Sequence, residues 1–219
     1  MNRRLKLSLV LWGGLVVGIV GLVSGGVVQA QTGGRLILED FQSKEVDGFP
    51  SNWENESQRS AARARSAYKV QADQDGSYLA VRDADQRIKK KKIDWDPKAY
   101  PVLSWRWRLH KAPATGDLLA ILYVSLDTDF LFIPVFTKYV WSVAKPVGTL
   151  AEGGMFSGSE LVVQSGTAPI GEWVEERVNV YEDFKRIHEH EPASKAWGIS
   201  IFCPPGVEID FGSIVASAQ

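Results

Sequence analysis

The run from Val102 to His110 alternates strictly between apolar and polar residues, and this alternation constrains the fold more than any other feature of the sequence. Successive side chains of a β-strand point to opposite faces, so a strict period of two predicts a strand. One face carries Leu103, Trp105, Trp107 and Leu109, and the other carries Ser104, Arg106, Arg108 and His110. Two indoles between leucines predict a face packed in the interior, with a sugar-stacking platform as the alternative.

Further short segments with the same period follow residue 34, separated by turn residues. We expect strands at Arg35–Phe41, Tyr68–Gln71, Tyr78–Arg82, Gln86–Ile93, Val102–His110, Leu118–Leu126, Phe136–Ser142, Glu160–Gln164, Trp173–Val180, Ala196–Cys203 and Val207–Val215. Asp75-Gly76 is expected to turn a hairpin, and Tyr181–His190 to form a helix. Glu176 interrupts the apolar side of its strand, which predicts a sheet edge or a bulge there. The predicted fold is all-β, a two-sheet antiparallel β-sandwich like a jelly roll, with one short helix.

The first 30 residues have the composition of an export signal. A basic start, Asn2–Lys6, precedes an uncharged apolar stretch that closes at the small-residue site Val28–Ala30. Cleavage there is expected; an uncleaved anchor is the alternative, because about 20 apolar residues span a bilayer. Removing residues 1–30 leaves 31–219, expected to form a single β-sandwich domain. The protein is therefore expected to be periplasmic or secreted, or anchored in the inner membrane by its N-terminal segment.

Charge and cysteine content exclude other classes of protein. The formal net charge is −1, and it becomes −4 once Arg3, Arg4 and Lys6 are removed. A mildly acidic domain is a poor binder of nucleic acid. One cysteine excludes an intramolecular disulfide framework. That residue, Cys203, lies between apolar residues and prolines and is expected to be a buried small hydrophobe rather than a nucleophile.

The one dense run of charge is Lys89–Lys92, preceded by Arg87. Lysines on a strand commonly keep a sheet edge from pairing with another molecule. The alternative is attraction of the run to an anionic envelope surface or to an acidic polysaccharide. The sequence leaves both interpretations open.

Five residues are candidates for contact with a ligand. Arg106 and Arg108 carry planar guanidinium groups, which suit carboxylates and paired hydroxyls. Glu175 lies on the polar side of its strand and can hold sugar hydroxyls. Tyr139 and Trp141 share one face of another strand, where their rings either stack on a sugar or fill the core. The predicted ligand-binding set is Arg106, Arg108, Tyr139, Trp141 and Glu175.

No combination of residues predicts a catalytic centre or a metal site. The Gly-x-Ser-x-Gly spacing of a nucleophile elbow is absent, and residues 154–158 miss it by one position. His188 and His190 are two apart, so on a helix they point in different directions and favour solvated residues over a zinc pair. Acid pairs such as Asp127-x-Asp129 lack the other ligands of an EF-hand loop. We expect no catalytic residue, metal ligand or cofactor, with a structural calcium as the alternative.

Several short motifs together resemble one family. They are Asp40-Phe41, Gly48–Trp53, Tyr68 with Tyr78-Leu79, Tyr100–Arg108, Tyr139–Ser142 and the stretch from Gly171 to Phe184. Over most of residues 35–190 the chain is similar to the secreted bacterial family catalogued as domain of unknown function 3047, most specifically in the run Leu103–Arg108. The resemblance implies a jelly-roll sandwich similar to galactose-binding-like carbohydrate modules, and no established activity. The chain departs from the family at Phe202–Gly206, where an Asp/Asn-rich segment would be expected.

Three functions are compatible with these features. The favoured hypothesis is an exported cell-envelope protein that acts as a non-catalytic, carbohydrate-binding-like module for a saccharide or other polyhydroxylated ligand, in association with the envelope surface or a polysaccharide. One alternative is a polysaccharide lyase, hydrolase or esterase, for which His110 beside Arg106 or Arg108 is the candidate within one strand. The other is a structural module that binds another envelope protein. A polar groove with exposed aromatics supports binding, and a flat apolar face supports a protein partner.

Overall fold

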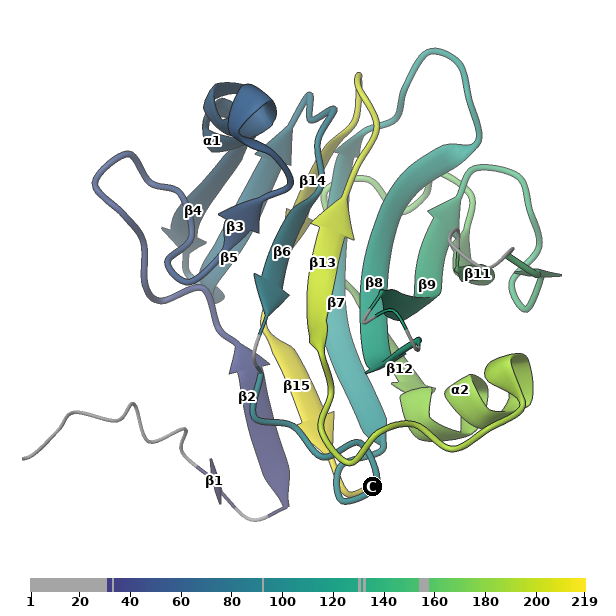
Figure 1. Ribbon diagram of the computed structural model, residues 1–219. Coiled ribbons are helices and arrows are strands. Elements are labelled where there is room, and N and C mark those ends of the chain that lie inside the picture. The colour runs from purple at the N-terminus through teal and green to yellow at the C-terminus, as the bar shows by residue number, and fades with distance from the viewer. Residues whose placement is uncertain (1–30, 33, 92, 130, 132, 154–157) are drawn as a thin grey trace, which may run out of the picture.

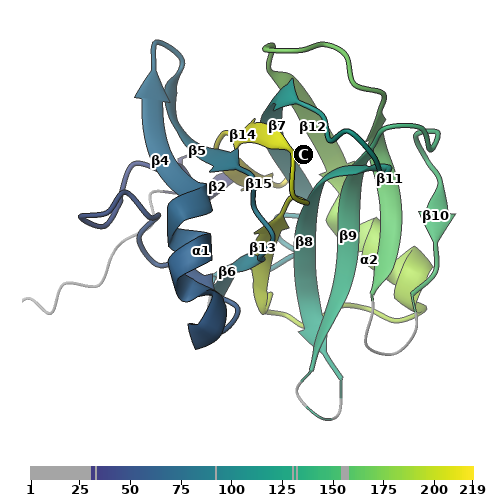
Figure 2. The same cartoon turned by 90° about the horizontal axis from the view of Figure 1, so that it is seen from above.

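The structure is a computed structural model that describes residues 31–219 except 33, 92, 130, 132 and 154–157. The predicted export segment and most of the near-miss serine motif lie outside the described residues. Two β-sheets pack face to face as two layers, which Figure 2 shows from above. The two-sheet sandwich predicted from the alternation is therefore confirmed.

One layer is an eight-stranded sheet, which lies behind the other in Figure 1. In spatial order its strands are β1 (Gln31–Thr32), β2 (Arg35–Glu39), β15 (Ile214–Ser217), β7 (Val102–Lys111), β14 (Glu208–Phe211), β5 (Gly76–Arg82) and β4 (Tyr68–Asp73). A further strand, β12 (Val174–Asn179), pairs with β7. The hairpin predicted at Asp75-Gly76 joins β4 to β5, where Asp73 pairs with Gly76.

The other layer is a seven-stranded sheet, whose strands β6, β13, β8 and β9 face the viewer in Figure 1. In spatial order it contains β10 (Leu150–Ala151), β11 (Ser159–Ser165), β9 (Pro134–Ser142), β8 (Leu118–Thr128), β13 (Gly198–Phe202), β6 (Ile88–Lys91) and β3 (Glu54–Asn55). Its pairings are antiparallel except that of β9 with β11, which is parallel. The prediction of antiparallel sheets therefore needs this one local correction.

The strand predicted over Val207–Val215 is divided in two. The chain bends at Gly212, whose backbone N–H donates to the carbonyl of Arg106 at 2.8 Å. The bend lets β14 and β15 pair with successive parts of β7. Gly212 is required at this bend because a Cβ atom there would lie 2.5 Å from Cγ of Arg106.

Two short α-helices flank the sheets. The predicted helix is α2 (Val180–His188), where the side chain of Asn179 accepts a hydrogen bond from the backbone N–H of Glu182 at 3.0 Å and Phe184 is buried. The helix α1 (Ala61–Ala67), preceded by a 3-10 turn over Gln58–Ser60, was not predicted. Its buried side chains are alanines, which produce no strong hydrophobic stripe in the sequence. In the described part of the chain, no helix combines the length and apolar character needed to cross a membrane.

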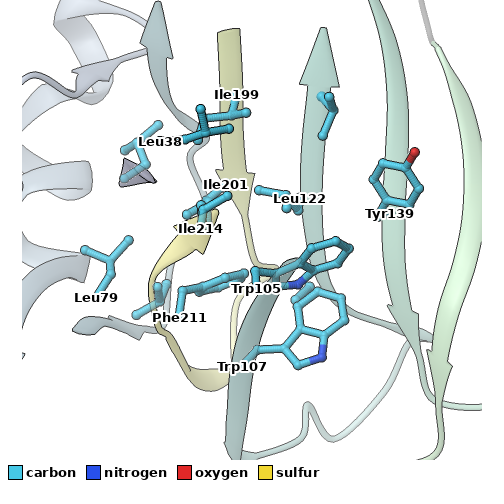
Figure 3. Close-up of a cluster of buried hydrophobic side chains, with 14 of the residues drawn as sticks. Leu38, Leu79, Trp105, Trp107, Leu122, Tyr139, Ile199, Ile201, Phe211 and Ile214 are labelled. Atoms are coloured by element: carbon cyan, nitrogen blue, oxygen red, sulfur yellow. The ribbon is translucent and has the colours of Figure 1, made fainter. Parts of the chain in front are cut away.

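The core lies between the two sheets and contains both indoles of β7. Trp105 and Trp107 are 2% and 0% exposed, and their ring centroids are 5.4 Å apart. Opposite them, β9 contributes Tyr139, 5.7 Å from Trp105, and Trp141, 5.4 Å from Trp107. Figure 3 shows Trp105 and Trp107 with Phe211 and the apolar side chains of the facing sheet. The core interpretation of the two tryptophans is therefore confirmed.

Candidate functional site

Arg106 and Arg108 lie on the outer face of the eight-stranded sheet, opposite the buried indoles. Arg108 donates from Nε and Nη2 to one oxygen of Asp210, at 3.0 and 2.8 Å, and from Nη2 to Asp73 at 3.0 Å. Its guanidinium lies 4.2 Å from the ring of Trp173. Burial lowers the pKa of Arg108, but the hydrogen bonds to the two carboxylates outweigh it and hold that pKa above its usual value. Arg108 is thus committed to internal contacts.

Arg106 and Glu175 meet at a shallow groove on the same face. They are direct neighbours on β7 and β12, and Arg106 donates to the carbonyl of Asp75 at 2.9 Å. Two adjoining cavities of about 410 and 200 Å³ share Arg106, and Glu175 lines the smaller. The larger contains the charged side chains Arg35, Asp40, Asp75 and Arg106. The two cavities together are lined by two cations, Arg35 and Arg106, and three carboxylates, Asp40, Asp75 and Glu175.

Tyr139 and Trp141 do not lie at any surface. Both rings are 0% exposed between the sheets, where Trp141 Nε1 donates to the carbonyl of Gly166 at 2.7 Å. The Tyr139 hydroxyl donates to Asp183 of α2 at 3.2 Å, and burial raises the pKa of Tyr139 well above its ordinary value. The prediction that these two rings contact a ligand is wrong, and the alternative that they fill the core is correct. The polar groups on the rings hydrogen-bond internally, so burial leaves none of them unpaired.

His110 has a carboxylate partner and lies outside the grooves found on the described residues. Its Nε2 lies 2.7 Å from Oδ2 of Asp210, whose other oxygen lies 2.8 Å from Arg82. Asp210 is fully buried, and His110 lines neither the groove beside Arg106 nor the one described below. A general base needs a substrate within hydrogen-bond reach, and neither groove brings one to His110. The enzyme hypothesis gains no support from His110.

The other reactive side chains have structural surroundings. Cys203 is fully buried, and burial raises the pKa of its thiol. The ring of His188 packs on Phe184 at 4.5 Å, and its Nε2 lies 3.2 Å from the hydroxyl of Thr137. Burial and then the neighbouring His190 lower the pKa of His188. Among the described residues, no three His, Cys, Asp or Glu side chains form a group able to hold a metal ion.

A second groove lies on the outer face of the seven-stranded sheet and has a volume of about 500 Å³. We call it the basic groove. Its lining contains the cations Arg87, Lys89, Lys91 and Lys138 and the aromatic side chains Tyr123, Phe136 and Trp197. Aromatic rings combined with a few convergent polar groups are typical of ligand sites.

The basic groove follows from the register of four adjacent strands. On β13, Ser200 pairs with Lys89 of β6 on one side and with Tyr123 of β8 on the other. Tyr123 pairs in turn with Lys138 of β9. The large side chains of Lys89 and Tyr123 thus stand on either side of the small side chain of Ser200. Gly198 continues this line of small residues, and a Cβ atom there would lie 2.4 Å from the carbonyl of Lys90.

The aromatic side chains of the basic groove are held in place by cations. The guanidinium of Arg87 lies 5.0 Å from the ring centroid of Tyr123 and 5.2 Å from that of Phe136. These two rings meet edge to face at 5.6 Å. On the other side, the ammonium of Lys91 lies 5.9 Å from the ring of Trp197. Burial raises the pKa of Tyr123, which keeps its hydroxyl protonated and able to donate.

Three of the four cations have a carboxylate partner outside the lining of the basic groove. Arg87 pairs with Glu56, Lys91 with Glu54 at 2.9 Å, and Lys138 with Glu160 at 3.2 Å. Lys89 makes no ion pair among the described residues. Cations therefore outnumber carboxylates here, in contrast to the groove beside Arg106.

Most of the basic groove was not identified from the sequence. The strand Phe136–Ser142 was predicted, but the face chosen for a ligand was that of Tyr139, whereas Phe136 and Lys138 on the opposite face line the groove. The lysines of the run Lys89–Lys91 also point alternately to opposite faces of the sheet. Lys90 points inward to Glu39, with 2.8 Å between Nζ and Oε2, while Lys89 and Lys91 point outward. The signal that could have located the groove is the set of alternate residues, on each predicted strand, that lie opposite its apolar side.

The solved structures to which this chain is similar match it with TM-scores below 0.5. The chain is 10% identical to the family 11 carbohydrate-binding module of the cellulosomal cellulase Lic26A-Cel5E of Clostridium thermocellum, with a TM-score of 0.46 over 86% of this chain and 97% of that one. It is 14% identical to the K1 cleaved adhesin domain of Lys-gingipain of Porphyromonas gingivalis W83, with a TM-score of 0.43 over 85% and 99% of the two chains. For endoglucanase 3 of family GH12 from Trichoderma harzianum, the identity is 10% and the TM-score 0.39, over 69% and 85%. We base no inference on similarities of this size.

A family model matches part of the sequence. No curated protein matches the sequence. The family model described as "Protein of unknown function (DUF3047)" matches residues 135–202, which run from β9 into β13 and include Phe136, Lys138 and Trp197 of the basic groove. The run Leu103–Arg108, the most specific part of the resemblance, lies before the matched segment. The resemblance to this family of unknown function is confirmed over residues 135–202.

Proposed function

We propose that the protein is a non-catalytic, carbohydrate-binding-like module that holds a saccharide in the basic groove. The observation that carries this proposal is the combination of three aromatic side chains with cationic and hydroxyl donors around one groove of about 500 Å³. The apolar face of a sugar ring packs on an aromatic ring, and its hydroxyls need hydrogen-bond partners. The basic groove offers both on adjacent strands of one sheet.

The chemistry of the lining favours binding over turnover. Hydrolysis of a glycosidic bond generally uses two carboxyl groups that face each other across the bond. The lining of the basic groove has neither a carboxylate nor a histidine. Its donors can orient hydroxyls, but none can act as the required acid and base pair at neutral pH.

Removing one aromatic wall tests this proposal. We expect Phe136→Ala and Trp197→Ala each to weaken binding of the recognised glycan about tenfold, which corresponds to about 1.4 kcal/mol, because a ring that stacks on the sugar is lost. The measurement is an array of neutral and acidic glycans read with wild type and both variants, followed by titration calorimetry on the glycan retained. Circular dichroism checks that each variant is folded.

The matched control lies in the other groove. Arg106→Ala alters the outer face of the eight-stranded sheet and should leave glycan binding unchanged. Binding that is lost in Arg106→Ala but kept in both aromatic variants would place the ligand beside Glu175 and contradict the assignment to the basic groove. A wild-type protein that retains no glycan would contradict saccharide binding itself.

We further propose that the protein works outside the cytoplasm, at the cell envelope. The support is the basic, then apolar N-terminal sequence that closes at Ala30. The expected result is that protein recovered from the periplasm or the culture medium begins at Gln31. N-terminal sequencing or intact-mass measurement of that protein checks it, and recovery of the full-length chain from the cytoplasm alone would contradict it.

A further inference from the structure

We infer that the saccharide bound in the basic groove is acidic and sparsely charged, with a uronic acid carboxylate held by Lys89. This inference rests on the proposed function and adds the class of ligand. The lining of the basic groove contains four cations and no carboxylate. A neutral sugar needs donors and acceptors in similar numbers, whereas this lining is rich in charged donors and poor in acceptors.

The four cations are spread over both sides of the groove. Lys89 and Lys91 stand two residues apart on β6, about 7 Å from one another along the strand. Lys138 stands on β9, beyond β13 and β8, and is 13% exposed. The guanidinium of Arg87 lies 5.0 Å from the ring centroid of Tyr123 and 5.2 Å from that of Phe136, and its Nε is buried with no hydrogen-bond partner among the described residues. A ligand lying along β13 would therefore meet positive charge on either side.

The carboxylates around the groove set how much negative charge a ligand can bring. Glu54, Glu56 and Glu160 each pair with one of the cations, and their side chains are 56%, 46% and 35% exposed. The three carboxylates leave one of the four cations uncompensated. A densely sulfated or phosphorylated chain would bring more negative charge than this one uncompensated cation balances, while a single carboxylate completes the balance. The balance of cations and carboxylates at the basic groove thus fits a saccharide with an occasional uronic acid unit.

Lys89 is the cation left over by this pairing. It makes no ion pair among the described residues. Its neighbour on β13, Ser200, is small and 1% exposed, and its neighbour on β3, Glu54, pairs with Lys91 instead. The ammonium is accordingly free to reach a group lying over Ser200. A charge-assisted hydrogen bond from an ammonium to a carboxylate is stronger than one between neutral groups. Lys89 therefore selects for the carboxylate, while Tyr123, Phe136 and Trp197 recognise the sugar rings.

The test compares one oligosaccharide in two charge states. The probes are a tetrasaccharide that carries a single glucuronic acid unit and the same tetrasaccharide with that carboxyl group methyl-esterified. We expect wild type to bind the acid about tenfold more tightly than the ester at low ionic strength, since only the acid forms the ion pair. The preference should shrink as salt is raised from about 0.05 to 0.5 M, because exposed charges are then screened.

Variants of Lys89 isolate its role. Lys89→Gln should bring the affinity for the acid down to that for the ester and leave the ester unaffected, whereas Lys89→Arg should keep the preference. The matched control is Lys111→Gln, an exposed lysine on the eight-stranded sheet, which should change neither affinity.

The outcomes separate this inference from the proposed function. If wild type binds acid and ester equally, and Phe136→Ala weakens both, saccharide binding stands and the acidic ligand is wrong. If a fully sulfated tetrasaccharide binds more tightly than the uronate, the sparse charge is wrong. If no glycan of the array binds to wild type, both proposals fail.

Discussion

Replacing Asp210 with alanine is expected to lower the free energy of unfolding by about 3 kcal/mol, because it leaves the largely buried guanidinium of Arg108 without its buried counter-charge. Asp210 is fully buried and touches Arg108 at 2.8 Å, Arg82 at 2.8 Å and His110 at 2.7 Å. Arg108 is only 14% exposed, so water cannot fully replace the lost carboxylate. Urea denaturation measures the change, and an unaltered dependence on denaturant would show that the unfolding transition remains cooperative.

The neighbouring acid provides the control. Asp73 also accepts a hydrogen bond from Arg108, but its side chain is 27% exposed and lies at the end of β4. Asp73→Ala is expected to cost less than about 1 kcal/mol, the range of a largely solvated ion pair. Equal losses in the two variants would show that the burial of Asp210 does not determine its contribution.

Replacing Glu176 with glutamine is expected to stabilise the protein by about 2–3 kcal/mol at pH 8 and to have little effect at pH 4.5. Glu176 lies on the inner side of β12, between Val174 and Val178, which pack against the core. Burial raises the pKa of Glu176 from 4.5 to about 7, and a hydrogen bond from Trp107 Nε1 at 3.1 Å only partly opposes it. Glutamine keeps an acceptor for that indole and removes the charge.

The sign of the pH dependence follows from the raised pKa of Glu176. Between pH 4.5 and 7 the folded protein holds a proton that the unfolded chain has lost, so stability falls as the pH rises through this window. Above pH 7 the carboxylate is charged in both states and the full penalty remains. Unfolding curves of wild type and Glu176→Gln should converge at low pH and separate above it. The control is Glu175→Gln, an exposed neighbour, and curves that stay parallel at every pH would contradict the assignment.

The fold could be predicted because the alternation within strands is local. In a two-layer sandwich, the alternating apolar residues of each strand indicate which of its faces is buried, and Trp105 and Trp107 indicate the buried face of β7. The bend at Gly212 could not be predicted, because it depends on a hydrogen bond to Arg106 more than 100 residues away. The edge position predicted for the strand of Glu176 agrees with the structure, since β12 pairs only with β7 among the described strands.

The candidate site was harder to predict because its residues meet only through the sheet. Lys89, Tyr123 and Lys138 come from three strands whose order is set by β13, far along the chain. Tyr139 and Trp141 were wrongly predicted to contact a ligand, because an amphipathic ring suits a protein core and a sugar equally well. The alternation within a strand shows which of its residues are polar, but which polar residues of different strands meet in one groove is decided by the order and register of the strands, and no single segment contains that information.

The positions of β13, β14 and β15 in the two sheets have a consequence for the time at which this protein can fold. Each of these strands is flanked on both sides by strands made much earlier, and β15 lies between β7 and β2. The seven-stranded layer is not continuous until translation has passed residue 202, and the eight-stranded layer not until it has passed residue 217. The nascent chain should therefore stay loose until these late strands have been made, as expected where pairing joins remote segments. An unfolded interval of this kind would suit the export that we propose, because a chain has to be unfolded to pass through a secretion pore.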